Sequence, residues 1–193
     1  IGHSIPPSKI NYRSNIDAFK KLGVTDVLSL SSVGSLNENL SPGVFVIINQ
    51  YVDFTKNRIT TFFDDDIVVH VSMATPTDEG LMEISRACLE KLDIKYNFGG
   101  SYICIEGPQF STKEESRLFQ KWGCDVIGMT SMPEAKLCRE ASLRYVNIGM
   151  VTDFDCWHPD HENVEVSNVI STLKGNAEDA KKFMLEFLLD YSK

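Results

Sequence analysis

The sequence lacks the features of a membrane protein or a nucleic-acid-binding protein. No apolar run approaches the roughly 18 residues that a membrane span requires. The net charge is −8, and Lys and Arg form no cluster that could attract a nucleic acid or an anionic membrane surface. The expected partner is therefore a small molecule, and neither nucleic acid nor membrane is expected as a partner.

The sequence also lacks the cysteine pattern of a disulfide scaffold. The number of cysteines is odd, no CxxC pair occurs and no secretory signal precedes them. We expect reduced cysteines in the core of a cytoplasmic protein. These are Cys88, Cys104, Cys124, Cys138 and Cys156.

No internal repeat and no linker rich in Pro, Gly or Ser divides the chain. One domain is expected over residues 1–193, in which 42% hydrophobic residues suffice for a packed core. The first residue is Ile1 rather than Met, and the opening "IGHSIPPSK" is typical of the middle of a loop. We therefore expect this domain to be truncated at its N-terminus.

Apolar periodicity predicts helices that alternate with strands. Helices are expected over 8–22, capped by Ser8 and ended by Gly23, and over 77–92, 111–119, 133–142 and 166–187. Strands are expected over 26–32, 44–51, 67–73, 102–107, 124–130 and 144–151. Most strands are continuous apolar runs, which indicates a sheet that is buried on both faces. The predicted fold is an α/β three-layer sandwich, with a mixed, largely parallel central sheet flanked by helices.

Polar residues follow several of the predicted strands. In open α/β sheets, ligands bind outside the carboxyl ends of the strands. The segments at these ends are 31–34, 106–108, 129–130 and 152–155. The last of them holds two acids, Asp153 and Asp155, immediately after an apolar run.

Four blocks of the sequence together resemble the trimeric purine nucleoside phosphorylase family. They are "GHSIPPSKINYRSNI", "SSVGSL", "YICIEGPQFSTKEESRLFQKWGCDVIGMTSMPEAKLCRE" and "MVTDFDCW", in this order. The resemblance covers essentially the whole chain. It implies a homotrimeric nucleoside phosphorylase that cleaves the N-glycosidic bond of a purine nucleoside with inorganic phosphate as co-substrate. Neither a metal nor an organic cofactor is expected.

Asp153 and Asp155 are the expected catalytic residues. On an extended segment, side chains two positions apart point to the same side, so both carboxylates would face the same way. Two carboxylates in a water-poor pocket raise each other's proton affinity, so one could hold a proton for N7 of the departing purine. A carboxylate also accepts from an exocyclic amine, which favours adenine over 6-oxopurines. The alternative is that the pair only caps a turn after the strand.

The resemblance also assigns the other site residues. Phosphate contacts are implied for Ser31, Ser32 and Thr130, a ribose contact for Met129, and packing against the purine for Phe110. Taken alone, each of these residues fits an ordinary turn, cap or core position.

The predicted 5′ pocket includes Ser111 and three residues of the last helix. Ser111 and Val166 match specificity positions of the family, and with Val169 and Ile170 they could form an apolar wall for a 5′-methylthio group. His70 matches a histidine that the family lends to a neighbouring subunit. The alternatives are the buried stripe of an amphipathic helix and a structural histidine.

The expected reaction is phosphorolysis of 5′-methylthioadenosine to adenine and 5-methylthioribose 1-phosphate. Turnover of adenosine or a 6-oxopurine nucleoside is one alternative, and an inactive nucleoside-binding or structural member is another. The family's Arg-His-Gly run, which grips phosphate, would precede Ile1. Residues 1–193 alone are therefore expected to show little turnover. His158 and His161 lack a third ligand and are interpreted as a solvated loop, and 64–66 as an exposed turn.

Overall fold

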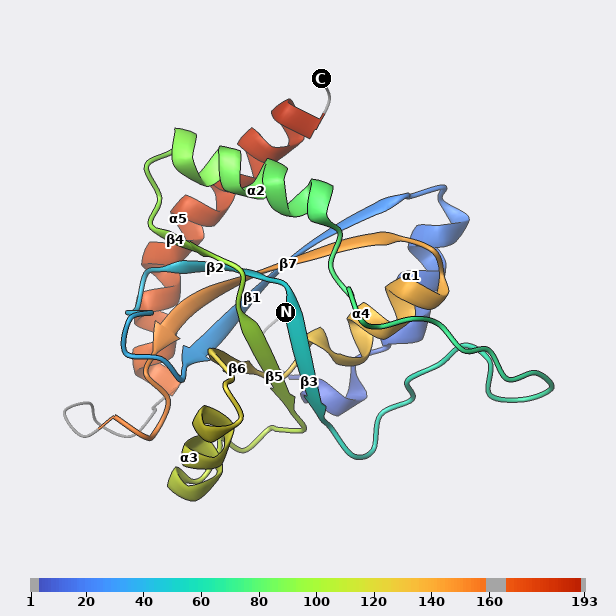
Figure 1. Cartoon of the computed structure of the whole chain (residues 1–193), viewed down its shortest axis with the longest axis horizontal. Helices are drawn as coiled ribbons and strands as arrows, with labels where there is room; N and C mark the ends of the chain where they lie inside the picture. Colours follow the sequence, from blue (N-terminus) through green and yellow to red (C-terminus); the bar gives the residue numbers. More distant parts are fainter. Residues whose placement is uncertain (1–3, 159–165, 192–193) are drawn as a thin grey trace.

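A computed structural model describes residues 4–158 and 166–191, with side chains for 4–158 and 175–191 (Figure 1). The strands are β1 (Asp26–Ser35), β2 (Phe45–Ile48), β3 (Gln50–Phe54), β4 (Tyr96–Phe98), β5 (Ser101–Ile105), β6 (Val126–Gly128) and β7 (Arg144–Asp153). The helices are the 3-10 helix η1 (Pro7–Lys9), α1 (Tyr12–Lys21), α2 (Glu79–Lys91), α3 (Lys113–Lys121), α4 (Ser131–Glu140) and α5 (Val166–Tyr191).

The described strands form one sheet in the order β3-β5-β6-β1-β7-β2-β4. The pairs β3–β5, β5–β6, β1–β7 and β2–β4 are parallel, whereas β1–β6 and β2–β7 are antiparallel. The longest pairing joins β1 to β7 and aligns Asp26–Val33 with Arg144–Val151. The prediction of a mixed, largely parallel sheet is confirmed.

Helices cover both faces of this sheet, which gives the predicted three layers. One apolar cluster joins α1 and α4 to β1 and β7, and another joins α2 and α5 to the opposite face. Figure 1 shows these two helix pairs on either side of the sheet, with α3 at its lower edge. The two apolar faces of β7 explain why its sequence is a continuous apolar run.

The strand predicted over 44–51 is two strands that pair with different neighbours. β2 pairs with β4 and β7, and β3 pairs with β5. Asn49 separates them: its main-chain N–H donates to Gly100 O, and its side-chain Oδ1 accepts from Gly100 N–H. This reciprocal pair turns the chain from one end of the sheet toward the other, which the apolar pattern does not reveal.

The strand predicted over 67–73 is wrong. Residues 67–73 form neither a helix nor a strand, and the side chains of Ile67 and Val68 are 61% and 78% exposed. β-Branched residues favour strands only where a neighbouring strand and a packed face are present. The predicted helix start is wrong too: Ser8 lies in η1, and α1 begins at Tyr12.

Three further observations concern features considered in the sequence. No helix among the described residues is long and apolar enough to cross a membrane. Residues 4–158 and 166–191 contain no group of three or more His, Cys, Asp or Glu side chains placed to hold a metal ion. All five cysteines are free; four are buried, and Cys156 is only partly buried.

Candidate active site

A cavity of about 670 Å³ lies where the second half of β1 meets the ends of β5, β6 and β7. Eight residues predicted from separate parts of the sequence line it together. They are Ser31, Ser32, Phe110, Ser111, Met129, Thr130, Asp153 and Asp155. The structure therefore brings the predicted base, ribose and phosphate residues to one place.

The two acids reach the cavity from the end of β7. Asp153 is the last residue of the strand, and Asp155 lies in the following turn with a φ of 51°. The Asp155 N–H donates to Asp153 Oδ1 at 2.8 Å, and the Thr152 hydroxyl donates to Asp153 Oδ2 at 2.7 Å. The expectation of one extended segment is wrong, since a left-handed turn, rare for a residue other than glycine, brings the carboxylates together.

Two serine hydroxyls donate hydrogen bonds to the Asp155 carboxylate. This carboxylate is buried, with the residue 4% exposed, and it accepts from the Ser111 hydroxyl at 2.8 and 2.9 Å and from the Ser116 hydroxyl. These hydrogen bonds occupy acceptor positions on Asp155. Asp153 accepts one local hydrogen bond on each oxygen, which leaves it further lone pairs beside the cavity.

Burial decides the protonation of both acids. Burial raises the pKa of Asp153, against the hydrogen bonds from Thr152 and from the Asp155 amide. It also raises the pKa of Asp155, where the charge of Asp153 adds to the effect and the two serines oppose it. Each carboxyl therefore holds a proton more readily than an exposed aspartate does.

Ser111 is free for this role because the α3 cap lies one residue further on. The sequence predicted a helix that starts at Ser111. In the structure, Thr112 is the N-cap of α3, and it forms the reciprocal capping pair with Glu115. Ser111 thus stands just outside the helix, and its hydroxyl turns to Asp155.

Gly34 allows β1 to pass close to the acids. A Cβ at this position would lie 3.0 Å from Asp153 Oδ1 and 3.1 Å from Ile127 Cγ2. Both contacts are tighter than side chains ordinarily make. The glycine of "SSVGSL" therefore preserves room for the Asp153 carboxylate, a role that the sequence pattern did not suggest.

Arg58 was not among the predicted site residues, and it organises the backbone under the cavity. Its guanidinium donates to the main-chain oxygens of Met129 at 2.6 Å, Met132 at 2.5 Å and Glu106 at 2.7 Å. Its Nε lies 3.6 Å from Glu106 Oε1, and the side chain is 1% exposed. No local motif marks this residue, because the carbonyls that it contacts lie 47 to 74 positions away.

Four predicted site residues are not seen at the cavity. His70 is exposed in the segment between β3 and α2 and does not line the cavity. The backbone of Val166, Val169 and Ile170 belongs to α5, but their side chains lie outside the described residues, as does His161. The roles predicted for these positions stay predictions.

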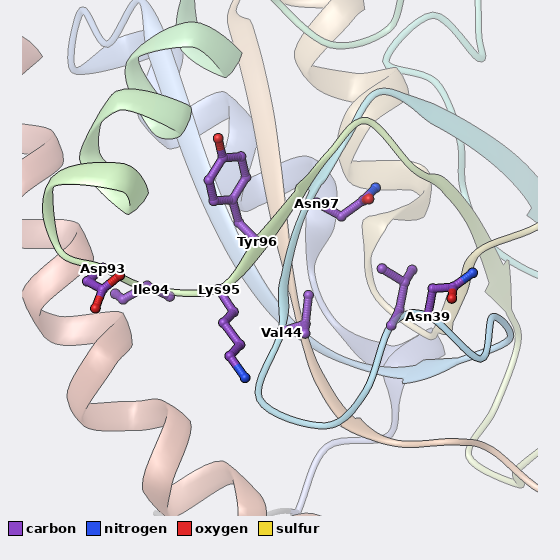
Figure 2. Close-up of a pocket in the computed structure, with 8 residues that line it drawn as sticks. Asn39, Val44, Asp93, Ile94, Lys95, Tyr96 and Asn97 are labelled. Atoms are coloured by element: carbon purple, nitrogen blue, oxygen red, sulfur yellow. The ribbon is translucent and has the colours of Figure 1, made fainter.

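A second pocket, of about 400 Å³, differs in chemistry from the cavity (Figure 2). It lies between the segment that leads into β2 and the segment 93–97, and it contains none of the predicted site residues. Figure 2 shows Lys95 and Tyr96 pointing in opposite directions. Since its polar groups do not converge on one point, we do not consider it as a catalytic site.

Comparisons with known proteins identify the family of the chain. A family model described as the phosphorylase superfamily matches residues 1–189. The S-methyl-5′-thioadenosine phosphorylase of Rhodospirillum rubrum is 53% identical over 183 residues, which cover 95% of this chain and 62% of that protein. The chain thus spans less than two thirds of the length of this relative.

Solved structures of methylthioadenosine phosphorylases also resemble this chain. Methylthioadenosine phosphorylase from Schistosoma mansoni in complex with adenine superposes with a TM-score of 0.95 at 36% identity, over 100% of this chain and 74% of that one. A mutant of the adenosine/methylthioadenosine phosphorylase from the same organism, in complex with methylthioadenosine, has a TM-score of 0.93 at 35% identity, over 100% and 73%. The family resemblance drawn from the sequence is confirmed, and the chain belongs to the phosphorylase superfamily.

Proposed function

We propose that the protein containing this chain cleaves 5′-methylthioadenosine with phosphate to adenine and 5-methylthioribose 1-phosphate. The observation that carries the proposal is the buried Asp153–Asp155 pair, in one cavity with an aromatic ring and a group of hydroxyls. Relatives named for this activity, and a solved relative that holds methylthioadenosine, support it.

In the proposed reaction, Asp153 contacts the base. Its raised pKa lets the carboxyl hold a proton for N7, and its lone pairs can accept from the exocyclic amine of adenine. Asp155 fixes Asp153 through its backbone amide and is itself fixed by Ser111. Phe110, which lines the cavity and is partly exposed, offers a ring for stacking on the purine.

Phosphate would bind on the opposite side of the sugar. Ser31, Ser32, Met129 and Thr130 line the cavity. The three hydroxyls would contact the phosphate, and Met129 would lie under the ribose. As the glycosidic bond breaks, positive charge develops on the sugar, and the phosphate anion both stabilises this charge and attacks the sugar. Phosphate is a co-substrate, and the reaction needs no metal or organic cofactor.

The substrate is tested by comparing three nucleosides. Purified complete protein is incubated in phosphate buffer with methylthioadenosine, adenosine or inosine, and the free base and sugar phosphate are separated by chromatography. Preferred cleavage of methylthioadenosine supports the proposal, whereas preferred cleavage of inosine refutes the assignment of the acid pair to an amino-substituted base. Binding of adenine without any product favours the alternative of a non-catalytic nucleoside-binding protein.

Adenosine is a second candidate substrate, because the Schistosoma mansoni relative is named for both adenosine and methylthioadenosine. The apolar wall expected from Val166, Val169 and Ile170 would discriminate between them, since a 5′-hydroxyl gains nothing from an apolar surface. A high ratio of kcat/KM for methylthioadenosine over adenosine is expected from the complete protein.

The oligomer and the compartment are also proposals. We infer a homotrimer in which His70 reaches the 5′ pocket of a neighbour, and the exposure of His70 outside its own cavity supports this. Light scattering tests the trimer, and loss of methylthioadenosine affinity in His70→Ala tests the contact. A cytoplasmic location is supported by five free cysteines and is tested by cell fractionation.

A further inference from the structure

A row of hydrogen-bonded side chains runs from the cavity into the core beneath the sheet. Ser31 lines the cavity, and its hydroxyl lies 3.2 Å from Asn147 Oδ1. Asn147 Nδ2 lies 3.4 Å from the Tyr145 hydroxyl, which in turn lies 2.8 Å from Glu134 Oε1. The parallel pairing of β1 with β7 places alternate residues of both strands on this face and so forms the row.

The row interrupts an apolar surface. Its neighbours on the same face of β1 and β7 include Val27, Val33 and Val151, which belong to the core cluster under α1 and α4. Asn147 is fully buried there. A buried amide without partners destabilises a fold, so a hydrogen-bonded row in this position indicates a specific use.

The carboxylate at the inner end sets the direction of every proton in the row. A carboxylate oxygen accepts hydrogen bonds, so the Tyr145 hydroxyl donates to Glu134. Burial, with the negative charge of Glu134 adding to it, raises the pKa of Tyr145 well above its ordinary value, so the hydroxyl keeps its proton. Toward Asn147, the Tyr145 oxygen can then act only as an acceptor, and it takes a hydrogen bond from the Asn147 amide as well as one from Ser29. The Asn147 carbonyl oxygen is left facing Ser31, and Ser31 must donate its single proton inward.

We propose that Ser31 presents only lone pairs to the cavity and thereby selects an oxyanion that carries a proton, such as monohydrogen phosphate, over one that carries none. The inference rests on the proposed function, because it concerns the phosphate site of that reaction. A P–OH group donates to Ser31 Oγ. An unprotonated oxygen would face a lone pair there with no proton between the two atoms, which is unfavourable in a closed site. Asn147, Tyr145 and Glu134 are positioning residues that act through Ser31.

Sulfate is the probe that tests the selection. At mildly alkaline pH, sulfate and phosphate are both mostly dianions of similar size, and only phosphate keeps a proton. Phosphorolysis of methylthioadenosine by the complete protein is measured over a range of phosphate concentrations, with sulfate as a competitor. We expect the inhibition constant for sulfate to exceed the KM for phosphate by about tenfold or more. Equal values overturn the inference and leave the proposed function standing.

Two matched variants test whether the row is the cause. Tyr145→Phe keeps the ring but removes the hydroxyl, so the Asn147 amide can turn and Ser31 can donate outward. The ratio of the sulfate constant to the phosphate KM is then expected to fall about threefold to tenfold. Ser29→Ala removes the other hydroxyl that donates to Glu134 Oε1, at 2.7 Å, but Ser29 is not on the path to Ser31. For Ser29→Ala, the ratio of the sulfate inhibition constant to the phosphate KM is expected to equal that of the wild type.

Each further outcome decides the inference. A folded Tyr145→Phe protein with the wild-type ratio overturns it, and so does a Ser29→Ala protein with the same loss as Tyr145→Phe. If Tyr145→Phe does not fold, Ser31→Ala takes its place, and an unchanged ratio in that variant also overturns the inference. Absence of phosphate-dependent cleavage of any purine nucleoside by the wild type refutes the proposed function, and this inference with it.

Discussion

Replacing Arg58 with lysine tests how the backbone under the cavity is held. The Arg58 guanidinium donates to main-chain oxygens at the ends of two strands and inside α4. These oxygens belong to Ile105, the last residue of β5, to Glu106 directly after it, to Met129 after β6, and to Met132 in α4. A guanidinium spreads its donors over a planar fork, whereas an ammonium gathers them at one point. Arg58→Lys keeps the charge, but the ammonium cannot donate hydrogen bonds to both strand ends.

The magnitude follows from the carbonyl oxygens that lose their donor. With one strand end served by the ammonium, about two buried carbonyls are left unpaired, and each costs about 1–2 kcal/mol. The Arg58 side chain is only 1% exposed, so water does not replace the lost donors. We expect the free energy of unfolding to fall by about 2–4 kcal/mol. The KM for phosphate should rise as well, because Thr130 directly follows Met129.

The assay is urea unfolding of the complete protein, followed by circular dichroism, with phosphate kinetics on the same samples. Arg13→Lys is the matched control, because Arg13 forms a partly exposed ion pair with Asp64 at 2.7 Å. That variant should stay within about 0.5 kcal/mol of the wild type. If Arg58→Lys also stays within that range, the reasoning about the fork is refuted.

Three further predictions concern charge and space around the site. Burial alone favours the neutral form of Glu106, but hydrogen bonds from a hydroxyl and two amides, together with the charge of the nearby arginine, lower its pKa from 4.5 to about 2. Its ionised form should therefore contribute on the order of 1–2 kcal/mol of stability above pH 4.5, lost as the pH falls toward about 2; urea unfolding of wild type and Glu106→Gln at neutral and acidic pH measures this, and a difference independent of pH contradicts it. Gly34→Ala places a Cβ 3.0 Å from Asp153 Oδ1, so kcat/KM should fall at least about tenfold while the protein stays folded; unchanged kinetics would show that the acid can move aside. Ser116→Ala removes a hydrogen bond that opposes the raised pKa of Asp155, so the acidic limb of the pH–rate profile should move to higher pH, and an identical profile would count against a titrating Asp155.

The sequence alone determined the fold class and predicted eight residues that line one cavity. Nearly continuous apolar runs predicted β5 and β7, because a strand buried on both faces needs apolar side chains at most positions. Asp153 and Asp155 were predicted from their place after a strand, and the other site residues from the resemblance of short motifs to the family. Such signals are local, so they can be identified without knowing which strands are neighbours.

Only the tertiary structure decided which polar groups meet. Arg58 contacts carbonyls far along the chain, and the row from Ser31 to Glu134 exists only because β1 lies parallel to β7. The β-branched segment 67–73 remained without a partner strand, and Asp155 reaches the cavity through a left-handed turn. A hydrogen bond between distant residues leaves no periodicity in the sequence, since it depends on strand order and register, which the whole fold sets.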